Sequence, residues 1–184
     1  MSQNHEEGLL HMDAERKQLV LQPLKGMPKL HMDEDQYRLK LDFLSASFLW
    51  MVILITGGAG LIGSNLIHYW LAQNPGDTIV NFDALTYAGN LANLAGVESN
   101  PNYHFFQGDL RKQEQLDEVF EQFSIDSVIH LAAESHVGRS IKDPSPFIDS
   151  NIRGTFQLLE TARNHWQEDL NDHRFLHVST DEVY

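Results

Sequence analysis

The chain has 184 residues, of which 42% are hydrophobic and none is cysteine, so it can form one domain with a substantial core but neither disulfides nor thiolate metal sites. Its formal net charge of −13 argues against nucleic acid or an anionic membrane as the main partner, although a phosphate-bearing ligand could still bind through local dipoles. The ten histidines are scattered without the spacing of a metal site, and the cytosol is the default compartment.

Residues 1–50 differ from the rest of the chain. They hold six Lys and Arg against eight Asp and Glu, whereas the remaining 134 residues hold seven against eighteen. A near-repeat, at residues 10–13 and 30–33, is compatible with two short units of one strand each and equally with chance similarity. Because Met51 stands directly before an apolar run, we expect residues 1–50 to be an appendage or an over-extended reading of the gene, and we assign them no function.

The uncharged run at residues 43–55 is too short to span a bilayer, which takes about 20 apolar residues. It also lies far from the N-terminus and lacks a basic leader, which argues against a secretory signal. We expect a loop that runs into a buried parallel strand.

A glycine-rich stretch, residues 56–63, follows the apolar run at residues 51–55 and precedes a helix-like pattern. This order predicts a strand, a glycine turn and a helix. In such a turn Gly57 allows the tight bend, Gly60 lets a pyrophosphate approach the backbone, and Gly63 lets the helix pack closely. The N-terminus of the helix would face the phosphates with free N–H groups and a partial positive charge.

Residues 78–82 read as a second strand, and it ends in Asp83, twenty residues after Gly63. A carboxylate at this place can accept hydrogen bonds from both hydroxyls of an adenosine ribose. It would repel the 2′-phosphate of NADP, so the pattern favours NAD. The alternative is a structural glycine turn that binds nothing.

Two more strands are predicted at residues 103–107 and 127–131. Asp109, after the first of them, could meet an adenine edge or cap a helix, and both roles stay open. The loop at residues 84–90 lies where an adenosine would sit, and the small Ala132 and Ala133 would let a cofactor lie against the end of the other strand. A helix between these strands has its apolar positions at helical spacing, namely Leu116, Val119, Phe120 and Phe123.

A long helix is expected from about Pro146, and residues 175–179 form a fifth strand that delivers Thr180, Asp181 and Glu182 at its carboxyl end. Adjacent acids at such a place suit either a solvated turn or a catalytic pair. One face of the helix carries Ile148, Ile152, Phe156 and Leu159. The predicted fold class is therefore α/β, with a Rossmann-like doubly wound parallel sheet of about five strands in residues 51–184, incomplete at its C-terminal side, and an unassigned N-terminal extension.

Four motifs in residues 51–184 together resemble those of dTDP-glucose 4,6-dehydratases, in the extended short-chain dehydrogenase/reductase superfamily. They are Gly57-Gly58-Ala59-Gly60-Leu61-Ile62-Gly63, Asp83-Ala84-Leu85-Thr86-Tyr87-Ala88-Gly89-Asn90, Leu131-Ala132-Ala133-Glu134-Ser135-His136-Val137 and Ser179-Thr180-Asp181-Glu182-Val183-Tyr184. Each motif alone is shared more widely. The presence of the last two motifs together resembles the pattern of these dehydratases rather than that of nucleotide-sugar epimerases.

The resemblance implies NAD as cofactor, dTDP-glucose as substrate and a place in nucleotide-sugar metabolism such as dTDP-rhamnose biosynthesis. By the family's chemistry NAD takes a hydride from C4 of the glucose and returns it to C6, Glu182 removes the C5 proton, Asp181 protonates the leaving C6 hydroxyl, and Thr180 binds the sugar near its reacting hydroxyl. Ser135 matches a contact with both cofactor and substrate. The positions that match the family's cofactor contacts are Leu61, Ile62, Asp83, Ala84, Leu85, Thr86, Asp109, Leu110, Leu131, Ala132, Ala133, Glu134, Ser135 and Ser150.

The chain departs from the family pattern in two ways. Gly138 stands where the family has an acid. The family's Tyr-x-x-x-Lys would come later than Tyr184, the last residue of the sequence, and Tyr184 itself belongs to the Asp-Glu-Val-Tyr motif. We therefore expect the 184-residue chain not to turn over substrate, and the homodimer of the complete family members is in doubt for it. The alternatives are an NAD-binding module without catalysis and a related nucleotide-sugar dehydratase or 4-epimerase.

Overall fold

The computed structural model describes residues 10–13, 18–21, 50–167, 170 and 172–179. The chain divides into two compact units, residues 1–49 and 50–184, and each is considered by itself. In the first unit β1 (Leu10–Asp13) and β2 (Gln18–Leu21) form an antiparallel pair in which Leu10 lies opposite Leu21. The first copy of the near-repeat is thus a strand, and the second copy lies outside the described residues.

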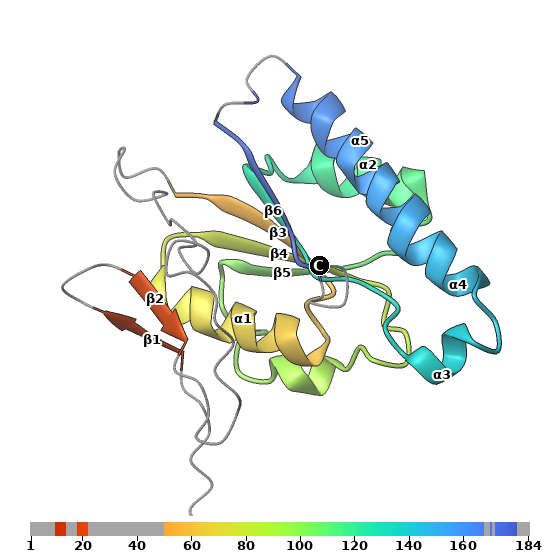
Figure 1. The fold of residues 1–184 in the computed structure, drawn as a ribbon. Helices are drawn as coiled ribbons and strands as arrows, with labels where there is room; N and C mark the ends of the chain where they lie inside the picture. Colours follow the sequence, from red (N-terminus) through yellow and green to blue (C-terminus); the bar gives the residue numbers. More distant parts are fainter. Residues whose placement is uncertain (1–9, 14–17, 22–49, 168–169, 171, 180–184) are drawn as a thin grey trace, which may run out of the picture. The chain divides into compact units, whose positions relative to one another are not determined.

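The second unit is built on a five-stranded parallel sheet (Figure 1). The strands lie in the order β5-β4-β3-β6-β7, so the first strand of the unit is central and the chain winds outward to both sides. This confirms the predicted Rossmann-like topology. The strands are β3 (Val52–Thr56), β4 (Thr78–Asp83), β5 (Tyr103–Gln107), β6 (Ser127–His130) and β7 (Arg174–His177).

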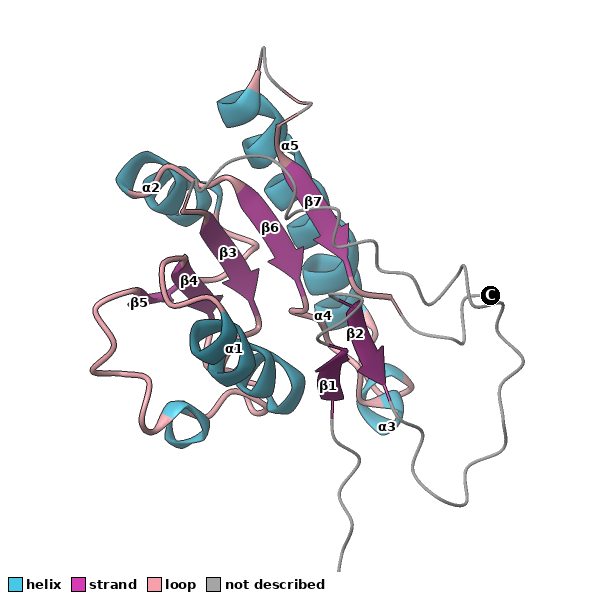
Figure 2. Cartoon of the chain, turned by 90° about the vertical axis from the view of Figure 1, so that its left-hand side faces the viewer, coloured by secondary structure: helices cyan, strands magenta, loops and turns pink. Residues whose placement is uncertain are grey.

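Helices cover both faces of this sheet. Figures 1 and 2 show α1 on one face and α2 with α5 on the other. Within the described ranges no helix is both long and apolar enough to cross a membrane. The helices are α1 (Leu61–Gln73), the 3₁₀-helix η2 (Leu91–Leu94), α2 (Gln113–Gln122), α3 (Val137–Ser140), α4 (Ser145–Phe147), the π-helix η3 (Ile148–Gly154) and α5 (Thr155–Trp166).

Each face of the sheet has its own hydrophobic core, because successive strand residues point to opposite faces. Leu54 is in register with Val80 and Val128, and all three are buried in the core that contains α2 and α5. Their neighbours Ile53 and Ile79 are buried on the α1 side. Burial on both faces explains why these strands read as continuous apolar runs.

The helix predicted from about Pro146 runs as α4, η3 and α5 without a gap, but its middle turn is a π-helix. The residues that α5 buries are Leu158, Thr161 and Ala162. The four apolar side chains expected on one face are instead exposed, by 45% at Ile148, 60% at Ile152, 62% at Phe156 and 44% at Leu159. Apolar spacing alone does not tell which side of a helix meets the sheet.

His130 is a polar side chain in the core on the α5 side, and it is only 1% exposed. Its Nδ1 lies 2.6 Å from Thr56 Oγ1 and its Nε2 lies 2.9 Å from Thr155 Oγ1. Burial, assisted by the nearby His177, lowers the pKa of His130 to about 4. The imidazole is therefore neutral at pH 7.

Acid should destabilise this unit through His130. A depressed folded-state pKa makes its contribution to stability complete above the unfolded value of about 6.5, and that contribution is lost as the pH falls toward 4. Between pH 7 and 4.5 we expect the free energy of unfolding to drop by about 2.5 kcal/mol from this group. Urea unfolding at the two pH values measures the drop.

The matched control is His130→Asn, which has no titrating ring. Its stability at pH 7 should be lower than that of the wild type, but the loss between pH 7 and 4.5 should be smaller. Equal losses in both proteins would show that protonation of His130 is not the cause.

Candidate functional site

The glycine turn after β3 depends on close backbone contacts. Gly57 has φ of 73°, and a Cβ there would lie 2.8 Å from both the nitrogen and the Cα of Ala132. A Cβ on Gly63 would overlap the carbonyl oxygen of Gly57 and lie 2.6 Å from Gly58 Cα. Both contacts are too short for any other residue, so the turn can sit directly against α1 and the end of β6 only with glycine at these places.

The first turn of α1 is open to an anion. Gly60 precedes the helix in an extended conformation, Ser64 N donates to Gly60 O at 3.0 Å, and the turn holds no acidic residue. The first N–H groups of a helix have no partner within it, and they carry the positive end of the helix dipole. Leu61 and Ile62 are 78% and 68% exposed, so their side chains leave this end accessible.

Asp83 ends β4 beside the glycine turn and is only 8% exposed. Its Oδ2 accepts a hydrogen bond from Ala59 N at 2.9 Å, and its Oδ1 accepts one from Leu85 N at 2.8 Å. Each carboxylate oxygen can accept a further hydrogen bond. The backbone therefore holds Asp83 in a fixed orientation at the carboxyl edge of the sheet, where a ribose could meet it.

The loop after β4 folds back onto the glycine turn, because Ala59 O accepts hydrogen bonds from Asn90 N and Asn93 Nδ2, both at 3.0 Å. Within this loop Ala84 is half-buried and Thr86 is exposed. The guanidinium carbon of Arg139 in α3 lies 4.2 Å from the centre of the Tyr87 ring. This contact joins the loop after β4 to the segment after β6.

Asp109 does not cap a helix, since α2 begins at Gln113 with Lys112 as its N-cap residue. Its carboxylate instead binds Arg111, with a shortest distance of 2.6 Å to the guanidinium, and this hydrogen bonding holds the pKa of Asp109 below its usual range. Leu110 is buried, and a Cβ on Gly154 of η3 would lie 2.9 Å from Leu110 Cβ. The helix-cap alternative is therefore wrong.

The segment after β6 is held by a residue that the sequence reasoning missed. Asn151 of η3 accepts a hydrogen bond from Glu134 N and donates one to Glu134 O, both at 2.8 Å. Glu134 Oε2 is buried with no hydrogen-bond partner in the described part of the chain. The only signal in the sequence was an asparagine, a poor helix former, in a helical stretch.

The other predicted site residues after β6 and on η3 differ in their exposure to solvent. Leu131 and Ala132 are half-buried, whereas Ala133 and Ser135 are exposed next to them. Ser150 is half-buried on η3, directly before Asn151.

The proposed catalytic residues Thr180, Asp181 and Glu182 lie outside the described residues. The described chain reaches Ser179, and Val178 N donates to His130 O at 3.1 Å. Since β7 runs parallel to β6, its carboxyl end lies at the same edge as the glycine turn. The roles of the three residues stay predictions.

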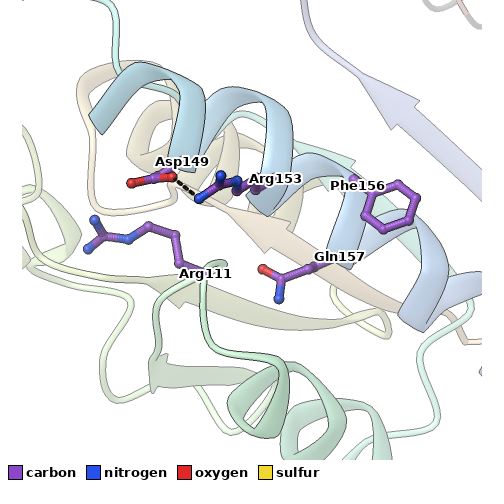
Figure 3. Close-up of a pocket in the computed structure, with 5 residues that line it drawn as sticks. All are labelled: Arg111, Asp149, Arg153, Phe156 and Gln157. Carbon is purple, nitrogen blue, oxygen red and sulfur yellow. Dashed lines mark hydrogen bonds and ion pairs between the residues drawn. The ribbon is translucent and has the colours of Figure 1, made fainter. Parts of the chain in front are cut away.

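A hollow of about 440 Å³ lies between the loop after β5 and the helix η3–α5, and it is lined by Arg111, Asp149, Arg153, Phe156 and Gln157 (Figure 3). Its charged groups are already paired, Arg153 with Asp149 at 2.8 Å and Arg111 with Asp109. Among the described residues no group of three or more His, Asp or Glu side chains could hold a metal ion. The glycine turn with Asp83 is a better candidate for a site than this hollow, because the Asp83 oxygens can accept further hydrogen bonds.

Comparison with known proteins identifies the family. The family model for GDP-mannose 4,6 dehydratase matches residues 54–184. The dTDP-glucose 4,6-dehydratase of Neisseria gonorrhoeae is 52% identical over 136 residues, which make up 72% of this chain and 39% of that relative.

Solved structures agree with this assignment. The dTDP-glucose 4,6-dehydratase of Streptomyces venezuelae, solved with NAD bound, is 44% identical, with a TM-score of 0.65 over 73% of this chain and 41% of that one. The UDP-glucose 4-epimerase of Thermus thermophilus, in complex with NAD, is 34% identical, with a TM-score of 0.56 over 62% of this chain and 34% of that one.

The chain spans between 38% and 40% of the length of the curated relatives that it matches. Over that part it shares about half of its residues with them, and it has the fold of the NAD-bound dTDP-glucose 4,6-dehydratases of Bacillus anthracis and Streptomyces venezuelae. The chain therefore belongs to the GDP-mannose 4,6 dehydratase family and is a homologue of dTDP-glucose 4,6-dehydratases over about 39% of their length.

Proposed function

We propose that the carboxyl edge of the sheet binds NAD and that the chain is the NAD-binding part of a dTDP-glucose 4,6-dehydratase. The observation that carries the proposal is the orientation of Asp83. Two backbone N–H groups, of Ala59 and Leu85, hold its carboxylate beside the glycine turn. A carboxylate at this place binds the hydroxyls of an adenosine ribose and repels a 2′-phosphate.

The surroundings of Asp83 fit the rest of a dinucleotide. The open first turn of α1 would take the pyrophosphate, because its free N–H groups meet no acidic side chain. The adenine would lie toward Asp109 and Leu110 after β5, and the nicotinamide toward residues 131–135 after β6. Glu134 Oε2, a buried acceptor to which no group of the described residues donates, supports a ligand near residues 131–135.

For the reaction, we propose the roles that the family assigns to the residues after β7. NAD would supply hydride acceptance at C4 and hydride return at C6 of dTDP-glucose, and the proton of the C4 hydroxyl would pass to the tyrosine of the family's Tyr-x-x-x-Lys. Glu182 would take the proton from C5 and return it to C5 as the hydride reaches C6, and Asp181 would give a proton to the C6 hydroxyl, which leaves as water. Thr180 and Ser135 would bind the sugar. Asp181 and Glu182 must hold opposite protonation states for this, so their site must push the two pKa values apart.

Two alternatives remain as outcomes of the tests. A module that binds NAD without catalysis is the first of them. An epimerase is less favoured, because the identity to the epimerase of Thermus thermophilus is 34% against 52% to the dehydratase of Neisseria gonorrhoeae. The homodimer implied by the resemblance is also a proposal, and the exposed apolar face of η3 and α5 supports it.

Cofactor binding should depend on Asp83. Asp83→Asn places an amide N–H against a backbone N–H and removes the negative charge, so we expect NAD affinity to fall about tenfold or more. The wild type should prefer NAD to NADP by about tenfold or more, and the variant should lose much of this preference. Titration calorimetry with both cofactors measures the affinities.

The matched control lies at the other end of the same strand. Asp77 accepts hydrogen bonds from Met51 N at 3.0 Å and Trp70 Nε1 at 2.9 Å, and it precedes β4. Asp77→Asn should lower stability and leave NAD affinity unchanged. Failure of the wild type to bind at millimolar NAD, or equal effects of the two substitutions, would refute the proposed site.

The reaction can be tested by substituting the two acids, Asp181 and Glu182, in a full-length protein that contains this sequence. Glu182→Gln should lower kcat by about 10² to 10⁴ and stop exchange of the C5 hydrogen with deuterated water. Asp181→Asn should keep the exchange but lose the 6-deoxy product, because only departure of the C6 hydroxyl is impaired. Mass spectrometry of the sugar measures both. Inversion at C4 without C5 exchange in the wild type would point to an epimerase instead.

A further inference from the structure

Thr56, the last residue of β3, shares its hydroxyl among three neighbours. Its Oγ1 accepts hydrogen bonds from Leu131 N and Ala132 N, both at 3.2 Å, and lies 2.6 Å from His130 Nδ1. Thr56 and His130 are partners in the parallel register, so both side chains point to the face that α5 covers. There His130 Nε2 lies 2.9 Å from Oγ1 of Thr155, the first residue of α5.

These contacts determine which ring nitrogen carries the proton. Leu131 N shares its hydrogen bond between Thr56 O and Thr56 Oγ1, both at 3.2 Å, and Ala132 N donates to Oγ1. Both lone pairs of Oγ1 thus face an N–H group, so its own proton is left to be donated. The acceptor at 2.6 Å is Nδ1 of His130, which therefore carries no proton. The proton of the neutral imidazole is then on Nε2, which donates to Thr155 Oγ1. Burial of the ring and the nearby His177 keep it in the neutral form.

The Thr56 hydroxyl also helps to set the distance between the glycine turn and the backbone of Ala132. Thr56 directly precedes Gly57, and the backbone it holds at Ala132 is the backbone that leaves no room for a Cβ on Gly57. If Nδ1 carried the proton, three donors would meet one hydroxyl oxygen with two lone pairs. At least one of the hydrogen bonds to residues 131 and 132 would then be lost.

We propose that His130, as the Nε2–H tautomer, is a positioning residue of the cofactor site. It orients the Thr56 hydroxyl so that the glycine turn and the backbone of Leu131 and Ala132 keep the spacing that NAD requires. Thr155 holds the outer nitrogen of the ring and links this spacing to the start of α5. The proposal rests on the proposed NAD site, and it adds a role for a side chain that does not itself reach the cofactor.

Two substitutions of His130 test the contacts of its two ring nitrogens separately. His130→Asn places Oδ1 near the position of Nδ1 and keeps an acceptor for Thr56. His130→Gln reaches toward the position of Nε2 and keeps only the contact with Thr155. Both variants should be less stable than the wild type. We expect NAD affinity within about threefold of the wild type in the Asn variant and about tenfold weaker in the Gln variant.

Leu158→Ala serves as a control for stability alone, since Leu158 is a fully buried core residue outside the site. It should destabilise the chain and leave NAD affinity unchanged. Equal losses of affinity in the Asn and Gln variants, or a loss in Leu158→Ala that matches the Gln variant, would overturn the positioning role.

A second measurement needs no cofactor. The ¹⁵N spectrum of the histidine ring should show Nε2 protonated and Nδ1 not, and a protonated Nδ1 at pH 7 would overturn the proposal. Hydrogen exchange at the amide of Ala132, which donates to Thr56 Oγ1, should be about tenfold faster in His130→Gln than in His130→Asn after correction for global stability. If these signals behave as expected while the wild type fails to bind NAD, the proposed function is wrong and the positioning role of His130 stands; equal exchange in both variants overturns that role.

Discussion

The contact between Gly57 and the backbone of Ala132 is the constraint on which the carboxyl edge of the sheet depends. At 2.8 Å from an ideal Cβ position, it permits only glycine and brings the end of β3 against the end of β6. Gly63 repeats the constraint on the other side, where α1 starts against Gly57 and Gly58. The turn is therefore packed closely between its neighbours. Its own N–H groups are bonded within the protein, from Gly57 to Phe82 O, from Ala59 to Asp83 Oδ2 and from Gly60 to Gly57 O, so an anion would meet the first N–H groups of α1 instead.

Buried polar side chains hold this arrangement where glycine offers no side chain of its own. Asp83 fixes the peptide of Ala59 from the side of β4, and Thr56 fixes the backbone of Leu131 and Ala132 from the side of β6. Loss of the Asp83 carboxylate would leave the buried N–H of Ala59 without this acceptor, at a cost of about 1–3 kcal/mol. Loss of the Thr56 hydroxyl would do the same for the half-buried N–H of Ala132, whereas Leu131 N would keep its bond to Thr56 O. These hydrogen bonds define one geometry, because each of the two side chains stands on one strand and bonds to the backbone of another part of the chain.

The helix η3–α5 has two different faces. Its inner face packs on the sheet through Leu158 and Ala162 and holds Glu134 through Asn151 of the π-helical turn. A π-helix inserts one extra residue per turn, and such turns are frequent at functional sites. Its outer face carries the exposed stripe from Ile148 to Leu159. One helix thus supports the candidate site from inside and presents an apolar surface outward.

The sequence by itself determined the parallel strands, about five in number, and the glycine turn, because apolar runs, glycines and a strand-ending acid are local patterns with a fixed spacing. It also placed Asp83 at the carboxyl edge. Only the tertiary structure decided that the apolar stripe of the long helix is exposed, that Asp109 binds Arg111, that Asn151 bonds to the backbone of Glu134, and that His130 contacts Thr56 and Thr155. The contacts of Asn151 with Glu134 and of His130 with Thr56 join groups 17 and 74 residues apart in the sequence, and no local pattern encodes such contacts. Asp109 and Arg111 are only two residues apart, but the same acid could also have capped a helix, and the conformation of the loop decides between the two.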